Sequence, residues 1–202
     1  MQPYGINYYL EDIKKELSEP VGTLQICGES QFTRALARRC EAWNIPYAFV
    51  DETDNGYPVV VDTEVKGGNH AGDDIDRGYP MSACAEAIAT YLPERMIYGR
   101  QICIIGRGKA VKGLRDHLES IGGTVIVCHS KTTPHLLYDI AVKSSIVVNA
   151  APSAWKNIRV SDSAFVIDVT GEAEKLVSGI NAPGIGLLTC AILARRASEW
   201  RP

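Results

Sequence analysis

The chain has 202 residues, of which 46% are hydrophobic and 22% are charged, as is ordinary for a globular protein with a buried core. Its formal net charge of −3 gives no general attraction for nucleic acid or for an anionic membrane. No apolar run is long enough to span a membrane and the N-terminal residues lack a signal-peptide pattern, so a cytoplasmic location is expected.

The six cysteines show no Cys-x-x-Cys spacing. Cys27, Cys103 and Cys128 fall in or at the ends of apolar runs, which predicts small buried side chains rather than disulfide partners. No His/Cys cluster has metal-ligand spacing, so no metal site is expected. His117 and His135 are interpreted as residues on helix surfaces.

The first elements along the chain predict a small α/β lobe. Residues 8–17 have helical periodicity with one charged face. Residues 23–27 are typical of a buried strand. Ser30 is then a candidate N-cap for a helix from Gln31 to about Trp43.

The next segment contains two further short strands, expected at 47–50 and 59–62. The Asp-Asn-Gly sequence at 54–56 between them predicts a tight turn and hence a hairpin. After a loop rich in Gly and Asp at 66–78, Ser82 is a candidate cap for a helix that ends near Leu92.

The most informative stretch runs from Gln101 to Ser130. An apolar strand at 102–105 is followed by the turn Gly106-Arg107-Gly108, a helix that ends at Gly122-Gly123, and a second strand at 125–127. A glycine turn between a strand and a helix brings backbone N–H groups to a nucleotide phosphate. Taken alone, this turn is equally consistent with a purely geometric role.

The end of the second strand favours NADP over NAD. An NAD site usually has Asp or Glu there, to bind the adenosine ribose hydroxyls. Here the strand ends in Cys128-His129-Ser130-Lys131, without an acid. Arg107, Ser130 and Lys131 offer charge-assisted hydrogen bonds to a 2′-phosphate, which a carboxylate would repel. Each residue alone is consistent with a surface role, and it is their convergence that favours NADP.

Four ordered motifs occupy roughly residues 99–193: GRGKAVKG with VIVCHSKTTPHL, then SSIVVNAAP, AFVIDVTGE and NAPGIGLLTCAIL. Together they resemble the bifunctional methylenetetrahydrofolate dehydrogenase/cyclohydrolase (FolD) family. The chain departs from that family's glycine-turn pattern at Gly108, Lys112 and Leu114, where the family has Ser, Gly and Pro.

The resemblance implies an α/β fold with a C-terminal Rossmann-type parallel sheet domain, a smaller, reduced N-terminal α/β lobe, and the active-site cleft between them. The implied boundaries are 1–95 for the folate-binding lobe, 96–185 for the NADP-binding domain and 186–202 for a C-terminal helix. Only about eight residues separate the second and third strand candidates of the first lobe, so the family's crossover helix is expected to be missing. A homodimer formed through the nucleotide lobe is also implied.

The resemblance also implies which residues bind the ligands. Those expected to bind the cofactor are Gly106, Arg107, Gly108, His129, Ser130, Ala151, Pro152 and Thr189. Pro183 and Gly184 are expected to bind substrate, in a loop beside the nicotinamide and the folate. Asp168 ends a predicted strand at the ligand-binding edge of the sheet, or only caps a turn.

In the first lobe, the family has a tyrosine that stacks on the aminobenzoyl ring and a lysine that serves the cyclohydrolase step. Alignment on the downstream Cys-Glu pair puts Phe32 at the tyrosine position and Leu36 at the lysine position. Alignment on the leading serine puts Thr33 and Ala37 there. Neither alignment supplies a lysine.

Arg34 and Arg38 flank the lysine position, but arginine does not release its proton near neutral pH and is a poor proton shuttle. With Arg39 they are more simply interpreted as a solvated helix face.

The segment Asp74-Ile75-Asp76-Arg77-Gly78-Tyr79 resembles the family loop whose Asp binds the pterin. Asp76 is therefore the residue expected to bind substrate and to act at the catalytic site, because a carboxylate accepts two parallel N–H bonds from a pterin edge. The alternative is a polar surface loop whose acids cap turns. A family glutamine has no clear counterpart, although Asp62 or Thr63 falls near its place.

The implied reaction is the oxidation of 5,10-methylenetetrahydrofolate to 5,10-methenyltetrahydrofolate with NADP⁺, a step of one-carbon metabolism. Hydride transfer needs mainly correct positioning, whereas methenyl hydrolysis benefits from an acid–base group. Weak or absent cyclohydrolase activity is therefore expected. Two alternatives stay open: a bifunctional enzyme that uses Arg34 or Asp62 for hydrolysis, and a non-catalytic dinucleotide-binding module.

Overall fold

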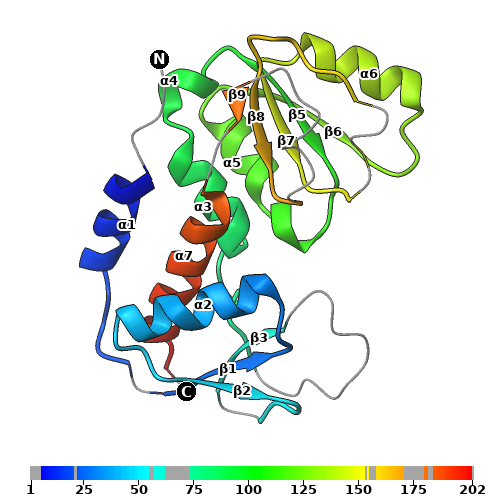
Figure 1. Ribbon diagram of the computed structural model, residues 1–202. Coiled ribbons are helices and arrows are strands. Elements are labelled where there is room, and N and C mark those ends of the chain that lie inside the picture. The colour runs from blue at the N-terminus through cyan, green and yellow to red at the C-terminus, as the bar shows by residue number, and fades with distance from the viewer. Residues whose placement is uncertain are drawn as a thin grey trace. The chain divides into compact units, whose positions relative to one another are not determined.

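The protein is an α/β chain with two parallel sheets (Figure 1). The computed structural model describes residues 6–20, 22–54, 57–61, 73–152, 154, 158–170, 180–181 and 184–201. The chain divides into two compact units: unit 1 contains Pro80–Ile185, and unit 2 joins Gly5–Tyr79 to Gly186–Pro202. The division thus falls after Tyr79 instead of after residue 95, and the C-terminal helix shares a unit with the N-terminal strands.

Unit 1 contains a sheet of order β6-β5-β7-β8-β9, with every adjacent pair parallel. Its strands are β5 Gln101–Ile105, β6 Thr124–Cys128, β7 Ile146–Asn149, β8 Phe165–Asp168 and β9 Ile180–Asn181. Its helices are α3 Ala83–Tyr91, α4 Glu94–Ile97, the 3₁₀ turn η1 Lys109–Val111, α5 Leu114–Ser120 and α6 Pro134–Lys143.

Helices cover both faces of the unit 1 sheet (Figure 1). On one face, Val147 and Val166 belong to an apolar cluster with Leu137 of α6. On the other face, Tyr91 of α3 stacks on Phe165, with ring centroids 6.1 Å apart. Phe165 and Val166 are consecutive in β8 and therefore point to opposite faces. This arrangement confirms the expected Rossmann-type layers.

Unit 2 contains a sheet of order β2-β1-β3-β4, again with parallel neighbours. Its strands are β1 Leu24–Cys27, β2 Tyr47–Val50, β3 Pro58–Val61 and β4 Asp73–Asp74, and its helices are α1 Ile6–Lys15, α2 Gln31–Ala42 and, after its first residue, α7 Ile185–Glu199. The Cys190 Sγ lies 4.0 Å from the Phe32 carbonyl oxygen, so α7 packs against α2 (Figure 1). None of the described helices combines the length and apolar character needed to cross a membrane.

The hairpin predicted from the turn at 54–56 is wrong. β2 and β3 do not pair with each other, because each pairs in parallel with the buried strand β1, on opposite sides of it. β2 and β3 therefore lie on opposite sides of β1, and the described residues between them, 51–54 and 57, form no helix, in agreement with the short spacing. Gln25 of β1 contacts this segment: its Oε1 accepts a hydrogen bond from the Asp54 N–H at 2.9 Å.

Candidate functional site

The strand order of unit 1 contains the reversal at which open α/β sheets usually bind ligands. From β5 the chain moves to β6 on one side and then passes to β7 on the other side of β5. Open α/β sheets bind ligands outside the carboxyl ends of their strands at such a reversal. In this chain that place is formed by Gly106, after β5, and by Ala150, after β7.

Gly106 allows these strand ends to meet closely. Its φ is +107°, and a Cβ there would lie 3.0 Å from the Ala150 carbonyl oxygen. Its N–H donates to the Cys128 carbonyl oxygen at 2.8 Å, while the Ala150 N–H donates to the Ile105 carbonyl oxygen at 2.8 Å. A side chain is therefore excluded, and the backbone itself borders the crevice, as a dinucleotide site requires.

The rest of the glycine loop is fixed by the start of α3. The Ser82 Oγ donates to the Ala110 carbonyl oxygen at 2.9 Å, and the Ser82 N–H donates to the Lys112 carbonyl oxygen at 3.1 Å. Ser82 also accepts a bond from the Ala85 N–H, which confirms it as the N-cap of α3. The N-terminus of α3 thus holds the loop at 106–113, which is the candidate phosphate loop, by hydrogen bonds.

The register of β5 and β6 brings the predicted 2′-phosphate residues together. Ile105 pairs with Cys128, so Arg107 and Ser130 each lie two residues beyond that pair, at neighbouring strand ends. Arg107, Ser130 and Lys131 are all exposed. Neither the loop at 106–113 nor that at 129–133 contains an acidic residue. This corner therefore has the charge that a 2′-phosphate requires.

His129 has a defined role within this corner. Its ring Nδ1 accepts a hydrogen bond from the backbone N–H of Lys131 at 3.1 Å, and its backbone N–H donates to the Thr132 Oγ1 at 3.0 Å. These two bonds hold the turn after β6 in place.

A network that was not predicted from the sequence joins the ends of β7 and β8. Asn149 is fully buried, and its Nδ2 donates to the Asp168 Oδ1 at 2.9 Å and to the Thr170 Oγ1 at 3.3 Å. Asp168 also accepts from the Thr170 N–H and hydroxyl, at 3.1 and 2.7 Å. Asp168 therefore caps the turn that follows β8, which is the alternative that the sequence left open.

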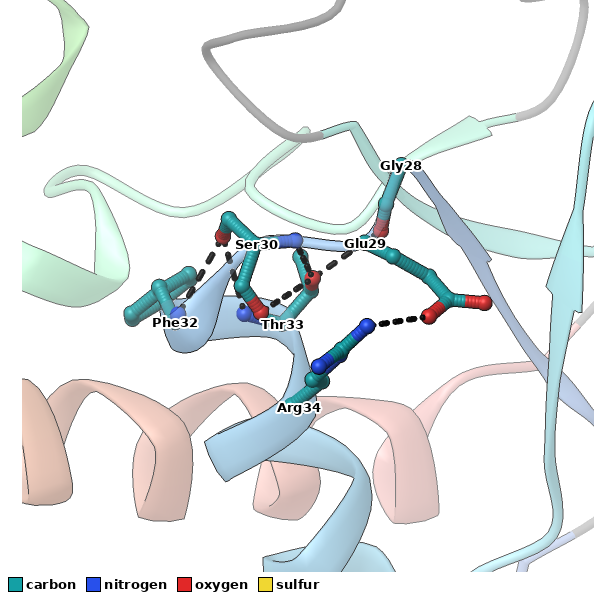
Figure 2. A network of polar contacts seen from close by, with 6 residues as sticks. All are labelled: Gly28, Glu29, Ser30, Phe32, Thr33 and Arg34. Atoms are coloured by element: carbon teal, nitrogen blue, oxygen red, sulfur yellow. Dashed lines mark hydrogen bonds and ion pairs between the residues drawn. The ribbon is translucent and has the colours of Figure 1, made fainter.

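In unit 2, Figure 2 shows the start of α2, where the sequence placed the folate-lobe motif. The Ser30 Oγ accepts from the Phe32 and Thr33 N–H groups, and the Thr33 Oγ1 accepts from the Ser30 N–H at 2.9 Å, which confirms the predicted cap as a capping box. Arg34 forms an exposed ion pair with Glu29 at 3.1 Å (Figure 2). That pair supports a solvated role for Arg34.

The candidate tyrosine and lysine positions on α2 differ in burial. Phe32 is 38% exposed, whereas Thr33, Leu36 and Ala37 are all buried. Thr33 in addition donates its hydroxyl proton to the Gly28 carbonyl oxygen at 2.9 Å. Of the two alignments, only the one that selects Phe32 presents an aromatic ring to solvent.

Asp76 forms an ion pair within its own unit. Its Oδ1 accepts a hydrogen bond from the Arg196 Nη1 at 2.5 Å, and only 1% of the Arg196 side chain is exposed. The Arg196 guanidinium lies 3.9 Å from the centre of the Tyr79 ring, and the Tyr79 hydroxyl donates to Glu199 at 2.9 Å. Arg196 gave no signal in the sequence, because it lies 120 residues from Asp76 on a helix with no motif at that point.

A hollow of about 230 Å³ lies beside this ion pair and is lined by Asp74, Ile75, Arg77, Tyr79, Arg196, Trp200 and Arg201. Burial and the hydrogen bond to Glu199 raise the pKa of Tyr79 to about 12. The Tyr79 hydroxyl is therefore a donor, and not a base, at neutral pH.

The remaining predicted residues are dispersed. Gly184 has φ +89° and directly precedes α7, and Thr189 is buried in the part of α7 that belongs to unit 2. Ala151 is half-buried and Pro152 exposed after β7. Pro183, Asp62 and Thr63 lie outside the described residues.

Within the described part of the chain, no group of three His, Cys, Asp or Glu side chains is placed to hold a metal ion.

Comparison with family models and with curated proteins finds no match. Solved structures do match. The FolD dehydrogenase-cyclohydrolase of Trypanosoma brucei, complexed with NADP cofactor and inhibitor, is 18% identical with a TM-score of 0.69, over 95% of this chain and 92% of that chain. A 5,10-methylenetetrahydrofolate dehydrogenase from the silkworm Bombyx mori is 18% identical with a TM-score of 0.68, over 96% and 93%.

The bifunctional FolD enzyme of Campylobacter jejuni gives 18% identity and a TM-score of 0.67, over 96% and 94% of the two chains. Each similarity extends over nearly the whole of both chains, so it does not rest on a dinucleotide-binding domain alone. At this level of identity the comparison establishes the fold: the chain has the two-lobe α/β architecture seen in FolD enzymes.

Proposed function

We propose that this chain is an NADP-dependent methylenetetrahydrofolate dehydrogenase, which oxidises 5,10-methylenetetrahydrofolate to 5,10-methenyltetrahydrofolate. The observation that carries the proposal is the basic, acid-free corner formed by Arg107, Ser130 and Lys131 at the ends of paired strands. Gly106 adds to it, since its missing side chain leaves room for a dinucleotide where the strand order reverses.

In this proposal the residues of unit 1 hold the cofactor. Arg107, Ser130 and Lys131 bind the 2′-phosphate, His129 shapes their turn, and the backbone at Gly106 and Gly108 approaches the pyrophosphate. Ala151 and Pro152 border the other half of the dinucleotide. The nicotinamide supplies the hydride chemistry when bound, and the protein contributes orientation and exclusion of water.

The folate assignment rests on the motif matches and on the folate enzymes among the solved structures of this fold. Phe32 is proposed to stack on the aminobenzoyl ring, because its ring is exposed. Asp76, Pro183, Gly184 and Thr189 are proposed to complete the folate and nicotinamide contacts. Because Asp76 Oδ1 already accepts a hydrogen bond from Arg196, a bound pterin would share this carboxylate with the arginine.

Weak or absent cyclohydrolase activity forms part of the proposal. Both alternative lysine positions, Leu36 and Ala37, are apolar and buried. Arg34 is paired with Glu29 and cannot act as a base at neutral pH. A positioned acid–base group contributes on the order of a hundredfold or more, so its loss affects hydrolysis more than hydride transfer.

A second candidate, a non-catalytic dinucleotide-binding module, is favoured by one observation. The Asp76 carboxylate is already neutralised by a buried arginine, as in a purely structural ion pair. Such a module would bind NADP but would not respond to folate.

The decisive experiment has two stages. Titration with NADP⁺ and NAD⁺ should show tighter binding of NADP⁺, and no preference would reject the cofactor assignment. The protein is then supplied with NADP⁺ and methylenetetrahydrofolate, and methenyl formation and decay are followed separately. Formation without accelerated decay supports the proposal. Accelerated decay indicates the bifunctional alternative. If the protein binds NADP⁺ but shows neither turnover nor thermal protection by folate, it is the non-catalytic module.

A homodimer formed through unit 1 is also proposed. β6 is an edge strand of the described sheet, and its Val125, Ile126 and Val127 side chains are only partly buried. An apolar edge of this kind is usually covered. Light scattering should give twice the chain mass of 22.0 kDa, and a Val127→Lys variant should reduce it to the monomer mass.

A further inference from the structure

Asn149 makes hydrogen bonds through both ends of its side chain, at the end of a central strand. It is fully buried, and its Oδ1 accepts from the Ala151 N–H at 3.2 Å. Its Nδ2 donates to Asp168 and to the Thr170 Oγ1. The two amide protons thus go to the last residue of β8 and to the loop after it, and the amide oxygen accepts from the loop after β7. A buried amide with these bonds has one stable orientation.

The backbone reinforces the same connection. The Val169 N–H donates to the Asn149 carbonyl oxygen at 3.0 Å, and Asn149 pairs with Asp168 in the sheet register. Asn149 therefore ties together the loops at 150–152 and 168–170. Asn149 is the last residue of β7, which places it beside both loops.

The position of these loops assigns them to one half of a bound dinucleotide. In the proposed function the adenosine half lies against β6, beside the basic corner, and a dinucleotide spans the crevice at the strand reversal. Its other half therefore extends over the carboxyl ends of β7 and β8. The loops that Asn149 joins lie at those ends.

We propose that Asn149 is a positioning residue, which holds the loops after β7 and β8 in the arrangement that receives the nicotinamide half of NADP⁺. The residue itself does not contact the ligand. It acts through the backbone of Ala151 and through the turn that Asp168 caps. This inference rests on the proposed function, since it presupposes a dinucleotide in unit 1.

The test separates the two halves of the cofactor by comparing NADP⁺ with adenosine 2′,5′-bisphosphate, which carries only the adenosine half. Calorimetric titration is carried out on the wild type, on Asn149→Ala and on Thr170→Val, which removes one partner of the amide while it preserves side-chain shape. Ser144→Ala is the matched control. Ser144 is 2% exposed and hydrogen-bonded to Gln101 and Ile140, at the opposite end of β7.

Asn149→Ala should weaken NADP⁺ binding by about tenfold, since it leaves buried polar groups without their partner, and should leave the bisphosphate affinity unchanged. Thr170→Val should act in the same direction by about threefold. Ser144→Ala should alter neither affinity, even where it lowers thermal stability. If Asn149→Ala does not fold, Thr170→Val carries the comparison alone.

Equal weakening of both ligands, or unchanged NADP⁺ binding in both variants, overturns the positioning role and leaves the proposed function intact. The same discrimination by Ser144→Ala would also overturn it, because a general loss of stability would then be sufficient. If the folded wild type binds neither ligand, the proposed function itself fails, and this inference with it.

Discussion

At the scale of single residues, the charges near the two candidate sites differ sharply in their surroundings. Arg107 is exposed and available to an incoming phosphate. Arg196 is buried, and its charge is balanced by Asp76. An exposed cation gains most from a ligand, whereas a buried ion pair mainly imposes a penalty when one partner is removed. The two arginines therefore call for different tests.

Arg107→Ala should weaken NADP⁺ binding by at least about tenfold, because a charge-assisted hydrogen bond to the 2′-phosphate is lost. NAD⁺ binding should change little, since NAD⁺ lacks that phosphate. Lys112→Ala, an exposed cation on the same loop, is the control and should affect neither cofactor. Fluorescence titration measures all four affinities, and an equal loss for both cofactors in Arg107→Ala would exclude the 2′-phosphate role.

Asp76→Asn should destabilise the protein by about 3 kcal/mol, because it leaves the buried Arg196 charge uncompensated. Arg34→Ala, which breaks the exposed pair with Glu29, should change stability by less than about 1 kcal/mol. Urea denaturation provides both values. A small effect of Asp76→Asn together with loss of folate binding would show that Asp76 serves the ligand more than the fold.

At the scale of elements, the caps and glycine turns follow from short stretches of sequence. Ser30 and Ser82 cap their helices as expected, because a cap depends only on residues within one turn. The strand partners of β2 and β3 do not follow from nearby sequence, since both strands pair with β1, which lies farther away along the chain. A turn signal at 54–56 predicts a bend from the sequence, but it does not predict which strand the next segment joins.

Gly113→Ala should destabilise the protein by at least about 2 kcal/mol. Gly113 has φ +79°, and a Cβ there would lie 2.3 Å from the Pro80 carbonyl oxygen. Gly108→Ala is the control on the same loop, since Gly108 has φ −73° and open space around its Cβ position. Thermal unfolding should show a lower midpoint for Gly113→Ala only. Similar midpoints would mean that the contact with Pro80 relaxes at little cost.

At the scale of the whole molecule, each unit has its own sheet, and the chain passes between the units after Tyr79 and again at the start of α7. Among the described residues, most of the side chains whose pKa is raised lie in unit 2. Burial raises the pKa of Cys40 and of Cys190 to about 12, and the pKa of Tyr79 rises to about 12 through burial and its bond to Glu199. All three groups are neutral when protonated.

Stability should therefore fall in alkaline solution. The pKa of each thiol is 9.0 in its ordinary state and about 12 in the fold, so the folded state retains protons that the unfolded chain releases. The contribution is fully present below about pH 9 and is lost as the pH rises from 9 toward 12. Urea midpoints measured across this range should decrease, and the decrease should be smaller in a Cys40→Ala variant. A constant midpoint would contradict the burial of these groups.

The sequence by itself determined the features whose physical cause is local. These are the strand periodicities, the helix caps, the glycine turn after β5 and the basic, acid-free end of β6. Each follows from residues within a few positions of one another, and the shared register of β5 and β6 brought the two halves of the proposed phosphate corner together.

Only the tertiary structure decided the partners of β1, the ion pair between Asp76 and Arg196, and the network around Asn149. These depend on which distant surfaces become buried together. A buried charge or amide must find a partner wherever packing brings one, and the sequence does not mark that partner.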